Sequence, residues 1–250
     1  MNNKKKCAAV AAADDHVNDD EFVLKSRRWM SGDISRCCLS MNDIYHHIHP
    51  PRTQPTLPLV PSLSGMLKVQ CCDFDLVSRE DWHADPPTDV EKMSNPVPFV
   101  IIHHSFMPPA CYSAEDCEKS MKKMQEMHQI TNGWNDVGYS FAVGGDGRAY
   151  EGRGWFNVGA HAPTYNNKSI GICIIGDWRT ELPPPQQLST VLKLINFGVR
   201  KGYIAKDYTL HGHRQVRNGT ECPGNALLEE ISTWEHFSPE AEMYFPPPPK

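Results

Sequence analysis

The segment GHRQVRNGTECPG (212–224) places an imidazole, His213, nine residues before a thiol, Cys222. Zinc binds histidine nitrogen at ~2.0–2.1 Å and cysteine thiolate at ~2.3 Å, and a catalytic zinc keeps three protein ligands and a fourth position for water. Such a site provides hydroxide at neutral pH, which suits amide hydrolysis. The segment therefore offers two ligands of a hydrolytic metal site, and a third must come from elsewhere in the chain.

The best source of a third ligand is VPFVIIHHS (97–105), an apolar run whose end carries His103 and His104. Successive side chains of a strand point to opposite faces, so only one of these two can face a site shared with His213. The residues alone leave both alternatives open. His211 adds another, because it lies two residues before His213 and would share its face of a strand. A fourth protein ligand there would close the site and make it structural.

Helix and strand signals alternate from Phe74 onward, and they predict an α/β domain with a central mixed β-sheet flanked by about three helices. Ser113, with Asp116 three residues later, is typical of a helix N-cap, and Asn132 with Gly133 should end that helix. In chain order, the expected elements are a strand over 99–102, the helix that Ser113 caps, a hairpin over 139–153, a strand over 169–178, a helix over 188–199 and a last helix over 225–234.

The two ends of the chain differ from this pattern. Residues 1–74 lack a sustained period and include HHIHPPRTQPTLPLVP (46–61), whose prolines remove backbone donors. We predict a disordered, Pro/His-containing leader over 1–74, a folded domain over 75–238 and a Pro-rich tail over 239–250. The first residues, MNNKKKCAAVAAA, have an apolar core too short and too rich in alanine for a secretory signal. An intracellular location is the expectation, and secretion is the alternative.

The composition is typical of a globular protein, with 250 residues, a formal net charge of −5 and 22% charged residues. Phosphate binding needs a basic stripe, and Lys4 to Lys6 is the only run of three basic residues, so we expect no nucleic-acid partner. No run approaches the ~18 apolar residues of a membrane-spanning helix, so we expect no membrane span. A monomer is the default expectation for the oligomeric state.

Six sequence strings occur in an order that is typical of a known family. They are SREDW (78–82), VIIHHS (100–105), WNDVGYSF (134–141), DGRAYEGRGW (146–155), VGAHAPTYNNKSIGICIIGD (158–177) and GHRQVRNGTECPG (212–224). On these strings the chain, from about Leu76 to Phe237, resembles the peptidoglycan recognition proteins, animal relatives of bacterial and phage type 2 N-acetylmuramoyl-L-alanine amidases. His83 departs from the pattern, since a small residue is common at that position.

The resemblance implies a zinc ion held by His103, His213 and Cys222. It places Tyr139 near the metal, where a phenol with a free pKa near 10 is a poor base and would orient the attacking water or stabilise the oxyanion. Thr220 stands where phage relatives carry a catalytic lysine, and its hydroxyl brings no charge, so its contribution should be smaller. Family members that only bind peptidoglycan commonly lack the cysteine, so Cys222 favours an enzyme.

The resemblance also implies bacterial peptidoglycan, or its muropeptide fragments, as the partner. Gly133, Trp134 and Arg153 match the combination with which family members prefer meso-diaminopimelate to lysine at the third stem residue. Diaminopimelate has an additional carboxylate, which a guanidinium fork can bind with two hydrogen bonds. His161 and His104 are predicted to line the groove and to contact the substrate.

The predicted function is zinc-dependent hydrolysis of the amide between N-acetylmuramic acid and L-alanine of diaminopimelate-type peptidoglycan, which would remove immune elicitors. The alternative is a non-catalytic receptor that binds peptidoglycan, or a modulator of innate immune signalling. By the same resemblance, Cys111 and Cys117 form a disulfide. Its seven-residue loop would contribute roughly 2 kcal/mol in an oxidising compartment.

Overall fold

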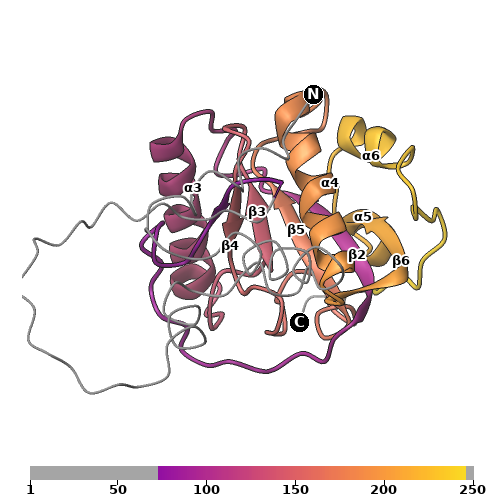
Figure 1. The fold of residues 1–250 in the computed structure, drawn as a ribbon, viewed down its shortest axis with the longest axis horizontal. Coiled ribbons are helices and arrows are strands. Elements are labelled where there is room, and N and C mark those ends of the chain that lie inside the picture. The colour runs from indigo at the N-terminus through magenta and orange to yellow at the C-terminus, as the bar shows by residue number, and fades with distance from the viewer. Residues whose placement is uncertain (1–72, 246–250) are drawn as a thin grey trace, which may run out of the picture. The chain divides into compact units, whose positions relative to one another are not determined.

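The structure is a computed structural model, and it describes residues 73–245 (Figure 1). The predicted leader lies almost wholly outside the described residues, and so does the end of the predicted tail, 246–250. Within the described part, no helix is both long enough and apolar enough to cross a bilayer.

A six-stranded mixed sheet forms the centre of the domain, with the strand order β1-β4-β3-β5-β2-β6. The strands are β1 (Leu76–Val77), β2 (Val97–His104), β3 (Phe141–Val143), β4 (Ala149–Glu151), β5 (Ser169–Ile174) and β6 (Ile204–Gly212). β3 and β4 form an antiparallel hairpin, and the other neighbouring strands run parallel. The predicted mixed sheet and its hairpin are confirmed.

Four α-helices accompany the sheet in the described residues. They are α3 (Ala114–Glu126), α4 (Pro185–Arg200), α5 (His213–Val216) and α6 (Asn225–Ile231), and a π-helical turn, η3 (Met127–Thr131), continues α3. Three of the four were expected. The four-residue α5 was not, because a single turn leaves no periodicity in the sequence.

The two faces of the sheet bury different side chains, and β2 shows the division. Ile102 lies in the core cluster that α4 covers. Ile101 lies in a separate cluster with Val216 of α5. Because side chains alternate along a strand, His103 shares the face of Ile101, and His104 shares the face of Ile102. The two adjacent histidines therefore enter different environments.

The helix α3 begins at the predicted cap and covers part of the His103 face. The Ser113 hydroxyl accepts the backbone N–H of Asp116 at 3.2 Å. Met121 of α3 is buried in one cluster with Cys173 of β5, and Cys173 pairs with His103 in the parallel sheet. The methionines of this helix fill the core, as is usual for this flexible side chain.

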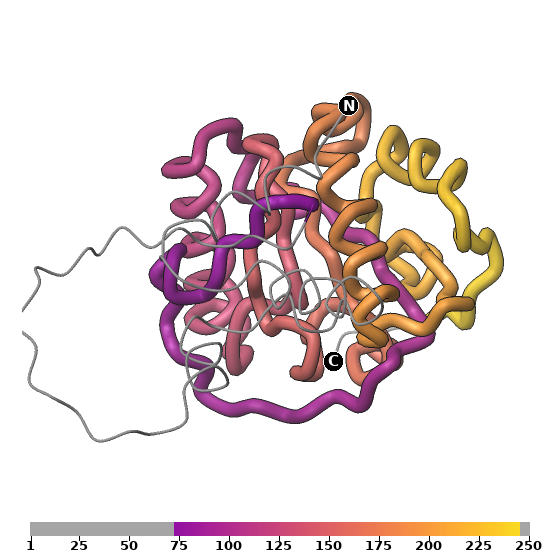
Figure 2. The backbone as a smooth tube through the Cα atoms, in the orientation of Figure 1, coloured from indigo at the N-terminus to yellow at the C-terminus, as the bar shows by residue number. Residues whose placement is uncertain are grey.

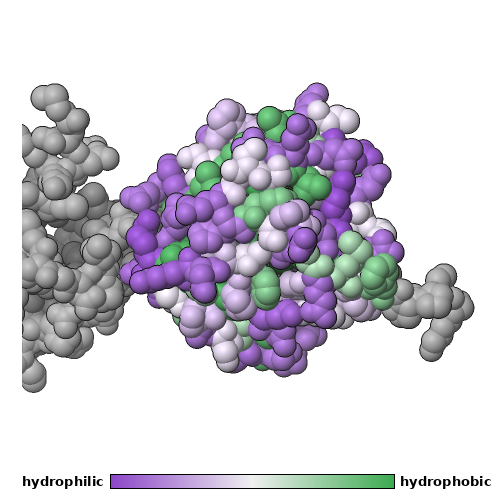
Figure 3. Space-filling view, turned by 90° about the vertical axis from the view of Figure 1, so that its right-hand side faces the viewer, coloured by the Kyte–Doolittle hydropathy of each residue, from purple (hydrophilic) through white to green (hydrophobic). Residues whose placement is uncertain are grey.

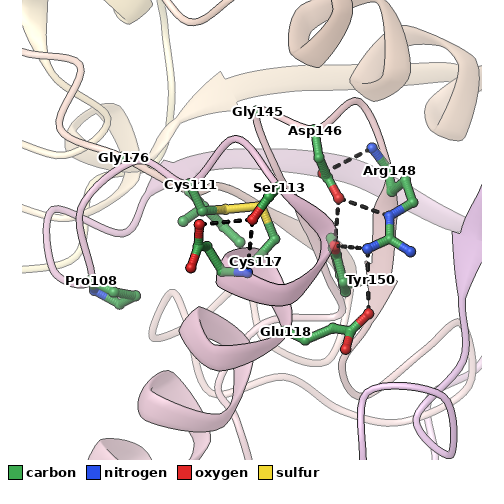
Figure 4. Close-up of a disulfide and its surroundings, with 12 residues drawn as sticks. Pro108, Cys111, Ser113, Cys117, Glu118, Gly145, Asp146, Arg148, Tyr150 and Gly176 are labelled. Atoms are coloured by element: carbon green, nitrogen blue, oxygen red, sulfur yellow. Dashed lines mark hydrogen bonds and ion pairs between the residues drawn. A yellow bond between two sulfur atoms is a disulfide. The ribbon is translucent and has the colours of Figure 1, made fainter.

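A disulfide joins Cys111 to Cys117 at the start of α3, as the resemblance implies (Figure 4). The turn between β3 and β4 packs directly against it. A Cβ atom added to Gly144 would lie 2.6 Å from the Cys117 sulfur, and one added to Gly145 would lie 2.5 Å from the Cys111 carbonyl oxygen. Only glycine allows so close an approach, so the disulfide and the hairpin turn are built to fit each other.

Arg148 of the same hairpin lies in a closed network of polar side chains (Figure 4). Its guanidinium is 2.7 Å from the Asp146 carboxylate, donates to the Tyr150 hydroxyl at 2.8 Å and lies 3.3 Å from Glu118 of α3. The Tyr150 hydroxyl donates in turn to Asp146 at 2.6 Å. The network connects the hairpin to α3.

The C-terminal segment runs beside β6, the edge strand of the sheet, and then beside α5 (Figure 2). The carbonyl of His236 accepts the N–H of Leu210 at 2.8 Å. Tyr244 donates its N–H to Val216 at 2.8 Å, and its carbonyl accepts the N–H of Asn218 at 2.9 Å. Unpaired groups of an edge strand are thereby satisfied. The boundary predicted between domain and tail falls inside this segment, which packs on the domain as far as Tyr244.

The surface that carries α6 and the C-terminal segment is mostly hydrophilic (Figure 3). Its apolar residues form small patches between hydrophilic ones. Scattered apolar residues are normal on the surface of a globular domain and call for no special partner.

Candidate metal centre

His103, His213 and Cys222 converge where β2 and β6 end. His103 lies in β2, and His213 is the first residue of α5, directly after the neighbouring parallel strand β6. Cys222 reaches both from the loop between α5 and α6. The ligand atoms of the three side chains lie within 4.8 Å of one another, and all three residues are buried. The predicted ligands therefore do meet in space.

The sulfur of Cys222 is the best-supported atom of this cluster. It lies 3.7 Å from Nδ1 of His103, and the backbone N–H of His104 donates to it at 3.4 Å. The backbone N–H of Cys222 itself donates to the Thr220 hydroxyl at 3.2 Å. A donor directed at sulfur favours the thiolate, which is the form that binds metal.

Burial sets the protonation states of the ligands. It lowers the pKa of His213 to about 3, with smaller contributions from Arg217 and His104. It also lowers the pKa of His103 well below its usual value, and neutral imidazoles keep the lone pair that a metal needs. Burial raises the pKa of Cys222 to about 12, so its thiolate requires a nearby cation. A bound metal ion would supply that charge.

One unpaired atom indicates that the cluster is built for a ligand. Nε2 of His213 is buried and has no hydrogen-bond partner among the described residues. Burying a polar atom without a partner is costly, so native structures rarely do so without a reason. Two imidazoles and a thiolate are donors suited to a first-row transition metal, and the residues present therefore fit a metal ion.

His104, the rival of His103, lies on the opposite face of β2. Its Nδ1 accepts the backbone N–H of Trp178 at 3.3 Å and lies 3.9 Å from the Asp177 carboxylate. Burial lowers its pKa to about 4, although Asp177 opposes this shift. The predicted contact between His104 and substrate has no support in this placement, because the imidazole is buried on the side away from the metal ligands.

His211 also lies outside the ligand cluster. Its Nδ1 is 3.1 Å from the Ser238 carbonyl oxygen, and its ring stacks on Phe99 with the centroids 6.0 Å apart. The ligand group found among the described residues has three members and does not include it. The geometry gives no support to the alternative of a closed, four-ligand structural site.

His161, which was predicted to line the groove, lies close to His103. The residue is only 6% exposed, and its Nδ1 lies 3.0 Å from Nε2 of His103. Burial lowers the pKa of His161 to about 3, so the ring is neutral. A side chain enclosed behind a metal ligand has little surface for substrate.

Tyr139 lies beside the cluster, just before β3. Its ring centroid is 5.2 Å from that of His103. Burial raises the pKa of Tyr139 well above 10, and Cys173, Cys222 and a hydrogen bond to the Cys173 thiol raise it further. The phenol therefore stays protonated and can act as a hydrogen-bond donor, in agreement with the expectation that it is not a base.

Gly133 and Trp134 form an exposed corner between η3 and β3. Gly133 has a φ of +67°, which favours glycine. Trp134 is 37% exposed, and its ring stacks on His128 with the centroids 4.8 Å apart. One face of the indole thus packs on His128, and the exposed part of the ring can contact a ligand.

Arg153 is held in place by backbone carbonyl groups. Its Nε donates to Val137 at 2.7 Å, and its two terminal nitrogens donate to Val158 at 2.8 Å and to Asp136 at 3.4 Å. Burial lowers its pKa, but a guanidinium remains charged. Of five N–H donors these bonds use three, which leaves two for a ligand.

Asp136 organises this region and was not singled out from the sequence. Its carboxylate pairs with Arg79 at 2.9 Å and accepts hydrogen bonds from Gln125 at 2.8 Å and from the Val137 N–H at 2.7 Å. It is 4% exposed. The loop 134–139 is thereby fixed. The available signal was the lone charged residue in WNDVGYSF.

Three buried donor residues that converge at one end of the parallel strands of an α/β domain are typical of metal-dependent hydrolases. Residues 93–225 match the N-acetylmuramoyl-L-alanine amidase family. The chain belongs to that family, as one of its peptidoglycan recognition members.

Two relatives and two solved structures show the extent of the similarity. Peptidoglycan-recognition protein LB of Drosophila melanogaster is 61% identical over 163 residues, which are 65% of this chain and 70% of that protein. Human N-acetylmuramoyl-L-alanine amidase is 42% identical over 160 residues, which are 63% of this chain but only 28% of the human protein. The wild-type Drosophila PGRP-LB structure matches with a TM-score of 0.64 and 61% identity, over 65% of this chain and 95% of that chain.

The second structure is peptidoglycan recognition protein LE in complex with tracheal cytotoxin, a monomeric diaminopimelic acid-type peptidoglycan. It matches with a TM-score of 0.64 and 41% identity, over 65% of this chain and 95% of that chain. The predicted family and fold are confirmed by these similarities.

Proposed function

We propose that the protein holds a zinc ion at His103, His213 and Cys222 and hydrolyses the amide between N-acetylmuramic acid and L-alanine of bacterial peptidoglycan. The observation that carries the proposal is the convergence of three buried ligand atoms within 4.8 Å. Imidazole and thiolate are preferred donors for zinc, and three protein ligands are typical of a catalytic site. Human and mouse relatives named N-acetylmuramoyl-L-alanine amidase support the reaction.

The groups around the ligands have separate tasks in this reaction. Zinc, when bound, lowers the pKa of water to about 7 and polarises a carbonyl group. Tyr139 stays protonated and donates a hydrogen bond to the oxygen on which negative charge develops. The Thr220 oxygen accepts the Cys222 N–H, so its hydroxyl proton remains available for a second hydrogen bond to the same charge.

Arg153 and Trp134 would select diaminopimelate at the third stem residue. The guanidinium keeps two unused donors in an orientation fixed by backbone carbonyls, which suits a carboxylate that lysine lacks. Trp134 offers an apolar wall beside Gly133. Relatives solved with tracheal cytotoxin, including PGRP-LE, bind a ligand of this type.

The test is hydrolysis of defined muropeptides by the purified full chain. Release of stem peptide is expected with added zinc and should be abolished by a chelator and by Cys222→Ser, because both remove the metal. Cys173→Ser is the matched control for metal content. The Cys173 thiol is not among the ligands, so this substitution should leave the amount of bound zinc unchanged. Unchanged release after chelation would overturn the proposal.

The same assay separates the enzyme from a receptor of the same fold. A receptor would bind muropeptide and retain zinc without releasing stem peptide.

Arg153→Lys keeps the positive charge and loses the forked guanidinium, so it should reduce kcat/KM for diaminopimelate substrates about tenfold more than for lysine substrates. Equal losses on both substrates would remove Arg153 from the specificity argument.

A further inference from the structure

His161 lies directly behind the metal ligand His103. Its Nδ1 is 3.0 Å from Nε2 of His103, and the two rings meet edge to face with their centroids 5.0 Å apart. On the other side of the His103 ring, Nδ1 lies 3.7 Å from the Cys222 sulfur. The two nitrogens of His103 therefore face different partners, one the metal cluster and the other His161.

Metal binding through Nδ1 would fix the tautomer of His103. A neutral imidazole has one N–H and one lone pair. The lone pair must lie on Nδ1 if that atom is to bind a metal beside Cys222, so the proton lies on Nε2 and is donated to Nδ1 of His161. The proton of His161 then lies on its own Nε2, which is buried and has no partner among the described residues.

The surrounding backbone holds the His161 ring in this orientation. A Cβ atom on Gly159 or on Gly171 would overlap the ring, so two glycines leave the space that it fills. The side-chain oxygen of Asn166 accepts the backbone N–H groups of His161 and Ala162, both at 2.8 Å.

We propose that His161 is a positioning residue that sets the tautomer and orientation of His103 for metal binding. The proposal rests on the proposed metal site. Groups that hold a ligating histidine from behind typically contribute 10–100-fold to metal affinity, most often as a carboxylate or a carbonyl. Here the imidazole of His161 has that role, because its Nδ1 accepts the hydrogen bond from Nε2–H of His103.

Two substitutions of His161 separate the hydrogen bond from the packing. His161→Asn keeps an acceptor near the position of Nδ1, whereas His161→Leu fills a similar space without an acceptor. We expect zinc affinity, measured by competition with a chelating dye, to fall about 10–100-fold in His161→Leu and to stay within about threefold of wild type in His161→Asn. Urea unfolding of the zinc-free proteins reports any loss of packing separately.

Nitrogen NMR of the imidazoles gives a second readout that does not depend on a variant. Zinc-free wild-type protein should show His103 protonated on Nε2, and the same tautomer should persist with zinc. A His103 protonated on Nδ1 would overturn the proposal. This result comes from the wild-type protein, so it holds even if zinc-free His161→Leu does not fold. Equal zinc affinity of wild type and His161→Leu would overturn it as well. Failure of the wild-type chain to bind zinc would instead refute the metal site of the proposed function.

Discussion

Two buried polar clusters of this domain differ in whether their atoms are paired. Under the β3–β4 hairpin, Arg148, Asp146 and Tyr150 satisfy one another at 2.6–2.8 Å. At the ends of β2 and β6, Nε2 of His213 is buried without a partner among the described residues. The hydrogen bonds of the paired cluster stabilise the fold, whereas the unpaired nitrogen of the other cluster can bind a ligand.

The comparison predicts that a change at the unpaired cluster affects binding and spares folding. His213→Leu should weaken zinc binding by about 1,000-fold or more, because it removes one of three ligands. The free energy of unfolding of the zinc-free chain should stay equal or rise, since an unpaired buried atom is lost. Competition with a chelating dye and urea unfolding measure the two effects. A large loss of zinc-free stability would contradict the distinction between the clusters.

The paired cluster should behave in the opposite way. Arg148→Met leaves the Asp146 carboxylate without its cation and should lower the free energy of unfolding by about 2–3 kcal/mol, toward the low end for a buried pair because a quarter of the Arg148 side chain is exposed. Zinc affinity should not change. Arg200→Met is the matched control, since its pair with Asp73 at 3.5 Å is exposed and should contribute less than about 1 kcal/mol.

The disulfide beside the paired cluster should contribute a smaller amount. Replacing Cys111 and Cys117 together by alanine opens a short loop and should cost roughly 2 kcal/mol of unfolding free energy. Reduction of the wild-type chain should lower its melting temperature to that of the double variant. If the reductant also lowers the melting temperature of the double variant, the effect does not come from this disulfide.

Per pH unit, the smallest effect is expected from pH, and it concerns the imidazoles near the site. Burial, with help from Arg153, lowers the pKa of His128 to about 4, against 6.5 for a free imidazole. Between these values the unfolded chain binds a proton that the folded chain does not, so the unfolding free energy falls as the pH falls, by up to about 1.4 kcal/mol per pH unit.

His128→Asn tests this pH effect, because the amide oxygen can still accept the Gly138 N–H that His128 Nδ1 accepts at 3.0 Å. The variant should show a shallower decline of unfolding free energy between pH 6.5 and pH 4 in zinc-free protein. If the unfolding free energies of wild type and variant fall in parallel with pH, His128 has the same protonation in the folded and unfolded states.

Most of the fold, and the segments that carry the three converging residues, could be predicted because each signal is local, whereas the choice of His103 over His104 and His211 came from the resemblance. His103 follows an apolar run, and His213 and Cys222 flank one short loop, so chain order and strand direction bring them to one edge of the sheet. The caps, glycines and prolines that delimit the helices are also readable without a structure.

Other features depend on contacts between distant segments and left no local signal. His161 was assigned to the groove because its string resembles the family, and only the structure shows its ring between Gly159 and Gly171. The packing of Tyr244 beside α5 is of the same kind, since nothing in a Pro-rich ending indicates which strand lies next to it.

The run from Phe99 to Ile102 carries no polar residue that would tell the two faces of β2 apart. A deletion of one residue in this run would move every later side chain of the strand to the opposite face of the sheet. In most strands such a shift by one residue would put an aliphatic side chain at the position of a metal ligand. Here it would exchange His103 for His104, so the doubled histidine would preserve the type of donor at the candidate metal site after the loss of one residue before it.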